Sequence, residues 1–287
     1  MDYILITHND LDGTVPVILA KIAIPNVTYF QCSYEEVNNT VQSIIERDKT
    51  TFLFIVDISI NAIIAEKLNN RGNVVLLDHH KTSTWLAQYN WARIDITKSA
   101  SFIFYEFLKS NFPNCSIEKY SSLVERTNDY DLWIHQYKES MDLNEFLSIV
   151  GHDLFIKRFL KDSSINFTQE EKLILETEQR RKISYFEEVT NKTKTFTENG
   201  YKYGVCFSDR YHSELGNTLL ENLQIDYVYI VDFLHNKVSL RSKGEIDVSQ
   251  IALKHNGGGH KNASGFPLKK EIVDDLINNL INPFRKK

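Results

Sequence analysis

Three polar clusters follow apolar, strand-like runs in the first half of the chain. The first is His8-Asn9-Asp10-Leu11-Asp12-Gly13, directly after the run Tyr3–Thr7. Its imidazole and two carboxylates alternate along the chain, so they can point to one side of an extended turn and converge on cations. A lone Asp-x-Asp-Gly is equally typical of a turn with a helix N-cap. This cluster alone therefore does not establish a metal site.

The other two clusters are acidic groups at the ends of fully apolar runs. Asp57 follows Phe52–Val56, where a carboxylate can bridge two metals or cap the helix that begins near Ile60. Asp78-His79-His80 follows Val74–Leu77. Three ligand-competent side chains after an apolar strand favour function over a simple turn, because they offer a metal ligand together with a group that orients it or contacts substrate.

Two later motifs add a carboxylate pair and an anion-binding candidate. Asn128-Asp129-Tyr130-Asp131 ends a helical stretch; Asp129 is the expected ligand and Asp131 can replace it. Gly257-Gly258-Gly259-His260 follows a predicted helix, Ser249–His255. Its glycines expose backbone N–H groups to an anion, and His260 adds a donor. A glycine helix C-cap explains one glycine easily but three poorly.

The elements that position these clusters alternate between strand and helix. The pattern predicts a βαβαβαβ series over Tyr3–Thr7, Thr14–Ile24, Val27–Gln31, Tyr34–Asp48, Phe52–Val56, Asn61–Arg71 and Val74–Leu77. Such alternation predicts a mostly parallel sheet with helices on both faces and ligands at the carboxyl ends of the strands. The first three clusters occupy such ends.

The second half becomes helical and then returns to strands. Helices are predicted over Ser99–Phe112, Ile117–Asn128, Asp142–Leu160 and Thr168–Asn191, and strands over Tyr201–Phe207, Tyr227–Phe233 and Lys237–Ser242. We therefore expect an α/β protein with a larger domain at 1–140, a helical connector at 141–193 and a smaller α/β domain at 194–287.

Composition narrows the class of protein. A hydrophobic share of 42% with 25% charged residues is typical of globular proteins. The net charge of −5 argues against a broad basic groove for long nucleic acids, although a local basic pocket stays open. Cys32, Cys115 and Cys206 lack the paired spacing of a disulfide framework or zinc knuckle. No signal peptide or membrane span is recognisable, so a cytoplasmic protein is expected.

The order of these motifs resembles the DHH phosphoesterase superfamily with its DHH-associated C-terminal domain. The likeness extends over nearly the whole chain. The motif at 8–13, together with Thr127-Asn128-Asp129-Tyr130-Asp131-Leu132-Trp133, is most similar to the oligoribonuclease (nanoRNase) branch of type B. The resemblance implies that 1–140 is the metal-binding catalytic domain and 194–287 the substrate-binding domain.

The resemblance also implies roles for individual residues. One metal would be held by His8, Asp10 and Asp57, and the other by Asp12, Asp57, His79 and Asp129, so that Asp57 bridges the pair. Asp78 would steady His79 or its neighbours, His80 would face the substrate phosphate, and Gly257, Gly258, Gly259 and His260 would close over the substrate. Arg241 is a further candidate for a phosphate or terminal-nucleotide contact, because a guanidinium binds phosphate oxygens bidentately.

The expected activity is a two-metal phosphodiesterase or exonuclease that hydrolyses short oligonucleotides to nucleoside 5′-monophosphates. Alternatives are hydrolysis of cyclic dinucleotides or of 3′-phosphoadenosine 5′-phosphate; a RecJ-type exonuclease on long strands and a non-catalytic nucleotide-binding protein are less favoured. Carboxylate-rich sites with imidazoles suit two Mn²⁺ ions better than Zn²⁺, with Mg²⁺ or Co²⁺ as substitutes. No membrane partner is expected, and the oligomeric state is left open, a homodimer included.

Overall fold

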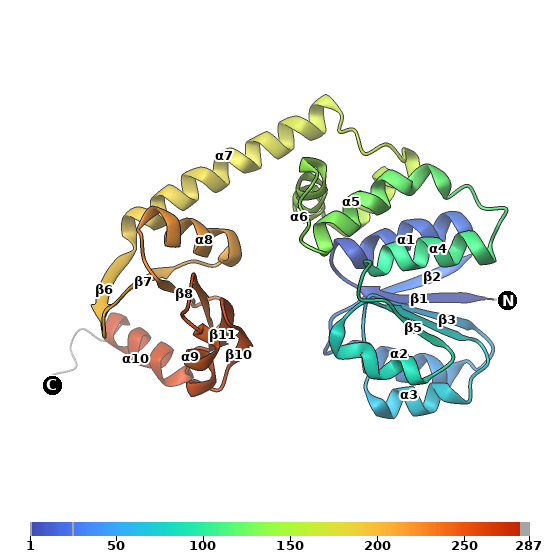
Figure 1. The fold of residues 1–287 in the computed structure, drawn as a ribbon, viewed down its shortest axis with the longest axis horizontal. Helices are drawn as coiled ribbons and strands as arrows, with labels where there is room; N and C mark the ends of the chain where they lie inside the picture. The colour runs from blue at the N-terminus through green and yellow to red at the C-terminus, as the bar shows by residue number, and fades with distance from the viewer. Residues whose placement is uncertain (1, 25, 282–287) are drawn as a thin grey trace. The chain divides into compact units, whose positions relative to one another are not determined.

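The computed structural model describes residues 2–24 and 26–281 (Figure 1). The chain forms two compact units, Met1–Glu176 and Thr177–Lys287. The point of division lies within a long charged helix, α7 (Gln169–Lys192). The roles predicted for the segments 1–140, 141–193 and 194–287 stay predictions; their outer ends, residue 1 and residues 282–287, lie outside the described residues.

The first unit contains a parallel sheet of five strands in the order β2-β1-β3-β4-β5. The strands are β1 (Tyr3–His8), β2 (Val27–Cys32), β3 (Phe52–Val56), β4 (Val74–Asp78) and β5 (Ala92–Ile94). The predicted α/β class and parallel sheet are confirmed. Since Thr7 pairs with Val56, and Val56 with Leu77, the residues that follow these strands meet at one edge of the sheet.

Helices cover both faces of this sheet (Figure 1). On one face lie α1 (Leu11–Ala23), α4 (Ala100–Asn111), α5 (Ser121–Asp131) and α6 (Lys138–Lys161), with the short 3-10 helix η2 (Glu118–Tyr120). On the other lie α2 (Val37–Arg47), α3 (Ala62–Asn69) and the 3-10 helix η1 (Lys81–Gln88). Strand alternation separates the two cores: Leu5 and Phe54 enter the first, whereas Ile6 and Leu53 enter the second.

One interruption in these helices concerns α6. The predicted helix Asp142–Leu160 is broken at Gly151, whose φ of 76° and ψ of 166° are not helical. A backbone with positive φ favours glycine, because a Cβ atom is strained there. The helix therefore consists of two segments joined at this residue.

The second unit contains a mixed sheet in the order β10-β11-β9-β8-β7-β6. Its strands are β6 (Lys194–Glu198), β7 (Tyr201–Phe207), β8 (Tyr227–Asp232), β9 (Lys237–Ser242), β10 (Gly258–His260) and β11 (Ala263–Pro267). Its helices besides the end of α7 are α8 (His212–Asn222), α9 (Val248–Lys254) and α10 (Lys270–Ile281). The parallel pair β7 and β8 is joined through α8, which packs on the sheet.

Membrane crossing would require a long helix of high hydropathy, and none of the helices within the described ranges meets both conditions.

Candidate metal centre and substrate-binding motifs

The loop after β1 brings His8 and Asp10 together. Asp10 caps α1, and its Oδ1 accepts a hydrogen bond from the Gly13 amide at 2.9 Å. The other oxygen, Oδ2, lies 2.8 Å from His8 Nδ1. Burial alone would raise the pKa of Asp10, but the bonds from His8 and Gly13 lower it overall. Gly13 is required here because a Cβ atom would lie 2.2 Å from the His8 carbonyl oxygen.

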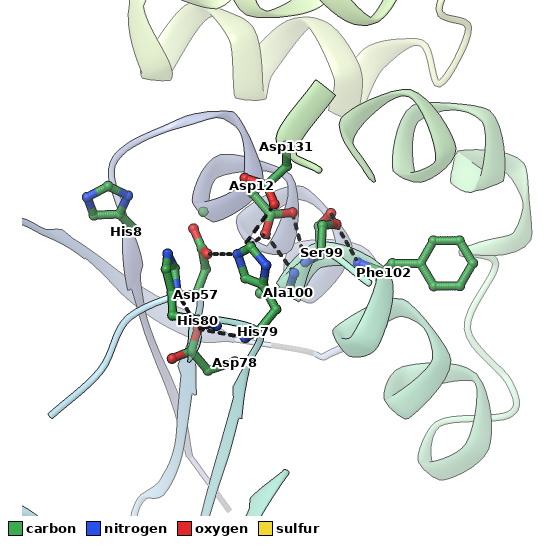
Figure 2. Close-up of polar contacts among 12 residues, drawn as sticks. His8, Asp12, Asp57, Asp78, His79, His80, Ser99, Ala100, Phe102 and Asp131 are labelled. Atoms are coloured by element: carbon green, nitrogen blue, oxygen red, sulfur yellow. Dashed lines mark hydrogen bonds and ion pairs between the residues drawn. The ribbon is translucent and has the colours of Figure 1, made fainter. Parts of the chain in front are cut away.

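Asp12 is held by the N-terminus of α4 (Figure 2). Ser99 caps that helix by accepting a hydrogen bond from the Phe102 amide, so the Ala100 and Ser101 amides remain available to other acceptors. The Ala100 amide donates to Asp12 Oδ2 at 2.7 Å and the Ser101 amide donates to Oδ1 at 3.0 Å. The positive end of the helix dipole thus stabilises a carboxylate that is only 1% exposed.

Asp57 combines an unusual backbone with a buried charge. Its φ of 62° is left-handed, and its side chain is 1% exposed. Among the described residues, its Oδ2 has no hydrogen-bond partner. Burial, followed by the neighbouring carboxylates Asp12 and Asp10, raises the pKa of Asp57 well above its usual value. A carboxylate placed in this way is suited to a cation.

His79 projects into the middle of the carboxylates (Figure 2). Its Nε2 lies 3.4 Å from Asp57 Oδ1, 3.4 Å from Asp131 Oδ2 and 3.8 Å from Asp12 Oδ2. Burial lowers the pKa of His79, which favours the neutral imidazole that metals bind. The buried Nε2 has no hydrogen-bond partner within the described part of the chain.

Asp131, and not Asp129, joins this group. Asp129 is 3% exposed and accepts bonds from Gln136 N at 2.9 Å, Tyr137 N at 3.2 Å and Ser140 Oγ at 2.6 Å. Two residues along a helix are about 200° apart, so the two carboxylates point to opposite sides of α5. The expected ligand Asp129 therefore anchors the turn before α6. Burial, followed by Asp12 and Asp10, raises the pKa of Asp131 to about 8.

Asp78 orients His80 rather than the ring of His79. Its Oδ1 lies 2.7 Å from His80 Nδ1 and accepts the His79 backbone amide at 2.8 Å. The hydrogen bond to Asp78 is the main cause of the raised pKa of His80. The ring of His80 is 34% exposed, so it is held in place and remains accessible.

Tyr34 is a residue of this site that the sequence analysis did not identify. Its hydroxyl lies 3.2 Å from His80 Nε2, and its ring centroid lies 4.8 Å from that of His8. Burial, followed by Asp57 and Asp78, raises the pKa of Tyr34. In the sequence it stands as an ordinary aromatic residue at the start of a predicted helix, so only the fold reveals its position.

The donors present fit divalent cations. Three groups have ligand atoms within 4.8 Å of one another: His8, Asp10 and Asp57; Asp12, His79 and Asp131; and Asp57, Asp78, His79 and His80. Within the described ranges, four buried atoms of these groups lack hydrogen-bond partners, namely Asp57 Oδ2, Asp78 Oδ2, His79 Nε2 and Asp131 Oδ2. Since buried polar atoms are normally paired, the convergence of these atoms fits the binding of a cation. Carboxylate oxygens and imidazole nitrogens suit hard or borderline divalent ions.

In the second unit, the glycine motif is a short strand rather than an open loop. Gly257 donates its amide to Ala252 O at 2.8 Å, and a Cβ atom on it would lie 2.1 Å from Gly265 O. Gly259 has a φ of 135°, and its Cβ would lie 2.5 Å from Ser264 Cα. Packing thus accounts for two of the three glycines, whereas the helix C-cap considered from the sequence accounts for one. A Cβ at Gly258 would meet no described atom within 4 Å.

Arg241 and His260 share one face of the second sheet. His260 pairs with Ala263, and Ala263 pairs with Arg241. Directly paired residues point to the same side, two strand spacings or about 10 Å apart. Arg241 Nη2 donates to Ser213 Oγ at 2.7 Å, and the Arg241 stem lies against Gly216, where a Cβ would be 2.5 Å from Arg241 Cγ. Helix α8 therefore sets the direction of the guanidinium.

Comparison with known proteins identifies a domain within the second unit and relatives that match nearly the whole chain. The DHHA1 domain model matches residues 212–286. Oligoribonuclease NrnB of Bacillus subtilis is 29% identical, covering 96% of this chain and 75% of that protein. A 3′,5′-cyclic-nucleotide phosphodiesterase of Helicobacter pylori is 24% identical, covering 96% of this chain and 98% of that protein.

Two solved structures share the fold. The pGpG-specific phosphodiesterase PggH of Vibrio cholerae has a TM-score of 0.61 at 15% identity, with 98% of each chain covered. Exonuclease RecJ bound to manganese has a TM-score of 0.62 at 14% identity, covering 97% of this chain and 89% of that one. Together, these comparisons show that residues 212–286 match a DHHA1 domain, and that the chain is similar over nearly its whole length to an oligoribonuclease and to a cyclic-nucleotide phosphodiesterase.

Proposed function

We propose that this protein is a metal-dependent phosphodiesterase that hydrolyses short oligonucleotides to nucleoside 5′-monophosphates. The observation that carries the proposal is the convergence of Asp57, His79 and Asp131, whose buried ligand atoms lack hydrogen-bond partners within the described ranges. The similarity to oligoribonuclease NrnB over 96% of the chain supports the choice of substrate class.

Two Mn²⁺ ions fit the donor set. His8, Asp10 and Asp57 would hold one ion, and Asp12, Asp57, His79 and Asp131 would hold the other, with Asp57 shared. When bound, such a pair supplies an activated water and stabilises charge on the phosphoryl oxygens. Carboxylates combined with imidazoles favour Mn²⁺ over Zn²⁺, which prefers closed tetrahedral sites. Mg²⁺ or Co²⁺ would substitute.

The chain's own residues orient this chemistry. The amides of Ala100 and Ser101 fix both oxygens of Asp12, so this ligand needs no reorganisation. Asp78 fixes Nδ1 of His80 and thereby directs the exposed edge of that ring to a substrate phosphate. Tyr34 borders the same edge, where a phosphate oxygen can replace its hydroxyl as the hydrogen-bond partner of His80 Nε2.

The DHHA1 domain would bind the rest of the substrate. His260 is exposed and shares a sheet face with Arg241, so an imidazole and a guanidinium can contact neighbouring phosphates. Gly258 has open space around its Cα, which permits close approach of an anion to the backbone. The net charge of −5 favours a short substrate with few phosphate contacts.

A substrate panel with Mn²⁺ tests this proposal. We expect fastest release of mononucleotides from substrates of about two to five nucleotides, with a weak salt dependence. The panel includes cyclic dinucleotides and 3′-phosphoadenosine 5′-phosphate, because similar proteins include cyclic-nucleotide phosphodiesterases. The Asp57→Asn protein, run in parallel, reports contaminating nucleases. Preferential cleavage of a cyclic dinucleotide, or of long single strands with a steep salt slope, would overturn the proposed substrate.

A further inference from the structure

A polar trio borders the metal-binding loop on the side of α1 and α6. Thr14 follows Gly13 in α1, Gln31 lies near the end of β2, and His152 follows the break in α6. Gln31 Nε2 lies 2.9 Å from Thr14 Oγ1, and His152 Nδ1 lies 2.9 Å from the same oxygen. Thr14 Oγ1 also donates to the Asp10 carbonyl at 2.5 Å. The trio is therefore bonded directly to the loop that presents Asp10 and Asp12.

The hydrogen bonds of Thr14 determine where the other hydrogens lie. A hydroxyl has one hydrogen and two acceptor positions. Because Thr14 gives its hydrogen to Asp10 O, its oxygen must accept from both Gln31 Nε2 and His152 Nδ1. Gln31 Nε2 and His152 Nδ1, which lie 3.2 Å apart, are then both donors to Thr14 Oγ1 and do not bond to each other. This assigns the Nδ1–H tautomer to neutral His152 and leaves a lone pair on Nε2.

Two acceptors consequently point away from Thr14. They are His152 Nε2 and Gln31 Oε1. Within the described ranges neither atom has a hydrogen-bond partner. Neither atom is one of the fully buried atoms without a partner, so both are accessible to solvent. The accessible groups of the neutral trio are thus acceptors, which repel a phosphate oxygen and suit a hydroxyl donor.

The break in α6 places His152 in this position. Gly151, directly before it, has a φ of 76°, and a Cβ there would meet no described atom within 4 Å. Backbone conformation, rather than lack of space, therefore selects glycine. A positive-φ residue in the middle of a helix redirects the residues that follow, and here the next residue forms the contact with Thr14.

We propose that His152 Nε2, beside Gln31 Oε1, accepts the single hydrogen of the substrate's ribose 2′-hydroxyl, and that the enzyme consequently prefers RNA to DNA. The inference rests on the proposed function, because it assigns a sugar to the substrate of that site. The 2′-hydroxyl is the group that distinguishes the two nucleic acids. Leaving His152 Nε2 unpaired in the bound complex disfavours the deoxy substrate, by roughly tenfold in kcat/KM for one lost hydrogen bond.

The test is the RNA to DNA ratio in kcat/KM for pApA and its deoxy counterpart. His152→Asn is the informative variant, because an asparagine amide can reach the position of Nδ1 and keep the bond to Thr14 but cannot reach Nε2. We expect this ratio to fall about tenfold towards one, since one acceptor is lost. Asp153→Asn changes an exposed neighbour on α6 and should keep the parent ratio. An unchanged ratio in His152→Asn would overturn the proposal.

A structural role for His152 gives a different result. If His152 only positions the Asp10 loop, His152→Ala should weaken Mn²⁺ binding and slow both substrates equally, whereas His152→Asn should restore both. That pattern would also overturn the proposal.

Binding of AMP and dAMP, measured by calorimetry, tests the subsite without turnover. We expect the parent to bind AMP about tenfold more tightly and His152→Asn to bind both alike. If the parent cleaves no oligonucleotide, the proposed function fails, while the AMP to dAMP ratio still decides whether this subsite reads the 2′-hydroxyl. Equal affinities in the parent would refute the subsite even if oligonucleotides are cleaved.

Discussion

Replacing Asp57 by asparagine should stabilise the metal-free protein and remove most of its stabilisation by Mn²⁺. Asparagine tolerates the left-handed backbone as aspartate does, so the substitution changes mainly the charge. The ligand atoms of His8, Asp10 and Asp57 lie within 4.8 Å of one another. The Asp10 carboxylate is thus a like charge at about 5 Å from Asp57, and repulsion at that distance costs roughly 3 kcal/mol at an effective dielectric constant of 20. Protonation relieves part of this repulsion, which leaves an expected gain of about 1–3 kcal/mol.

The sign of this effect follows from the pKa. The folded-state pKa of Asp57 is raised, so its repulsion destabilises the metal-free protein increasingly as pH rises above the ordinary value of 3.8. Asparagine removes this dependence. For a unit of 176 residues, the gain corresponds to a rise in Tm of roughly 2 to 12 °C.

The assay is differential scanning calorimetry of both proteins in EDTA and in saturating Mn²⁺, at pH 8. Asp153→Asn serves as a control, because it removes an exposed carboxylate. Turnover of a dinucleotide should fall to below about a tenth of the parent rate, since a shared ligand is lost. A variant with a lower Tm in EDTA and an unchanged response to Mn²⁺ would refute the reasoning.

Three further outcomes are expected. Asp131→Asn should weaken Mn²⁺ binding, measured by calorimetry, more than Asp129→Asn does. Asp129→Asn should instead lower the free energy of unfolding by about 1–3 kcal/mol, because hydrogen bonds to Asp129 are lost. Weaker Mn²⁺ binding in Asp129→Asn than in Asp131→Asn would restore Asp129 as the ligand. Because the pKa of Asp131 is raised to about 8, the metal-free protein loses stability as pH rises through about 8. Mn²⁺ affinity should accordingly rise between pH 6.5 and 8.5, up to about tenfold per pH unit for each proton released. An Mn²⁺ affinity that does not change over this pH range would contradict the prediction. Gly258→Val and His260→Ala should lower dinucleotide turnover without changing Mn²⁺ affinity or Tm, and Gly258→Ala should be milder, because the space around Gly258 is open.

Sequence patterns predicted strands where apolar runs were long and buried. β1, β3 and β4 fall within a residue of their predicted bounds, and the clusters that follow them meet at one edge as expected. The three-residue β5 is too short for periodicity to detect, and β6 is exposed along its whole length, so it has no apolar pattern. Glycines at 258 and 259 hid the strand β10.

The residues of the site were predictable where type and position in a strand determine direction. His8, Asp57 and His79 are in this class. The choice between Asp129 and Asp131 depends on where α5 ends and on which side each residue faces, which the spacing alone left open. Thr14, Gln31 and His152 lie on three separate elements, so only the folded chain brings them together.

The contact between Gly216 and Arg241 links two positions that should vary together among relatives. A side chain at 216 would overlap the arginine stem, with its Cβ 2.5 Å from Arg241 Cγ. We expect lineages that keep arginine at 241 to keep glycine at 216, and lineages that lose the arginine to accept alanine or serine there. A helix-interior glycine costs about 1 kcal/mol relative to alanine. Its persistence would therefore record selection for a recognition residue elsewhere in the chain rather than for the helix that contains it.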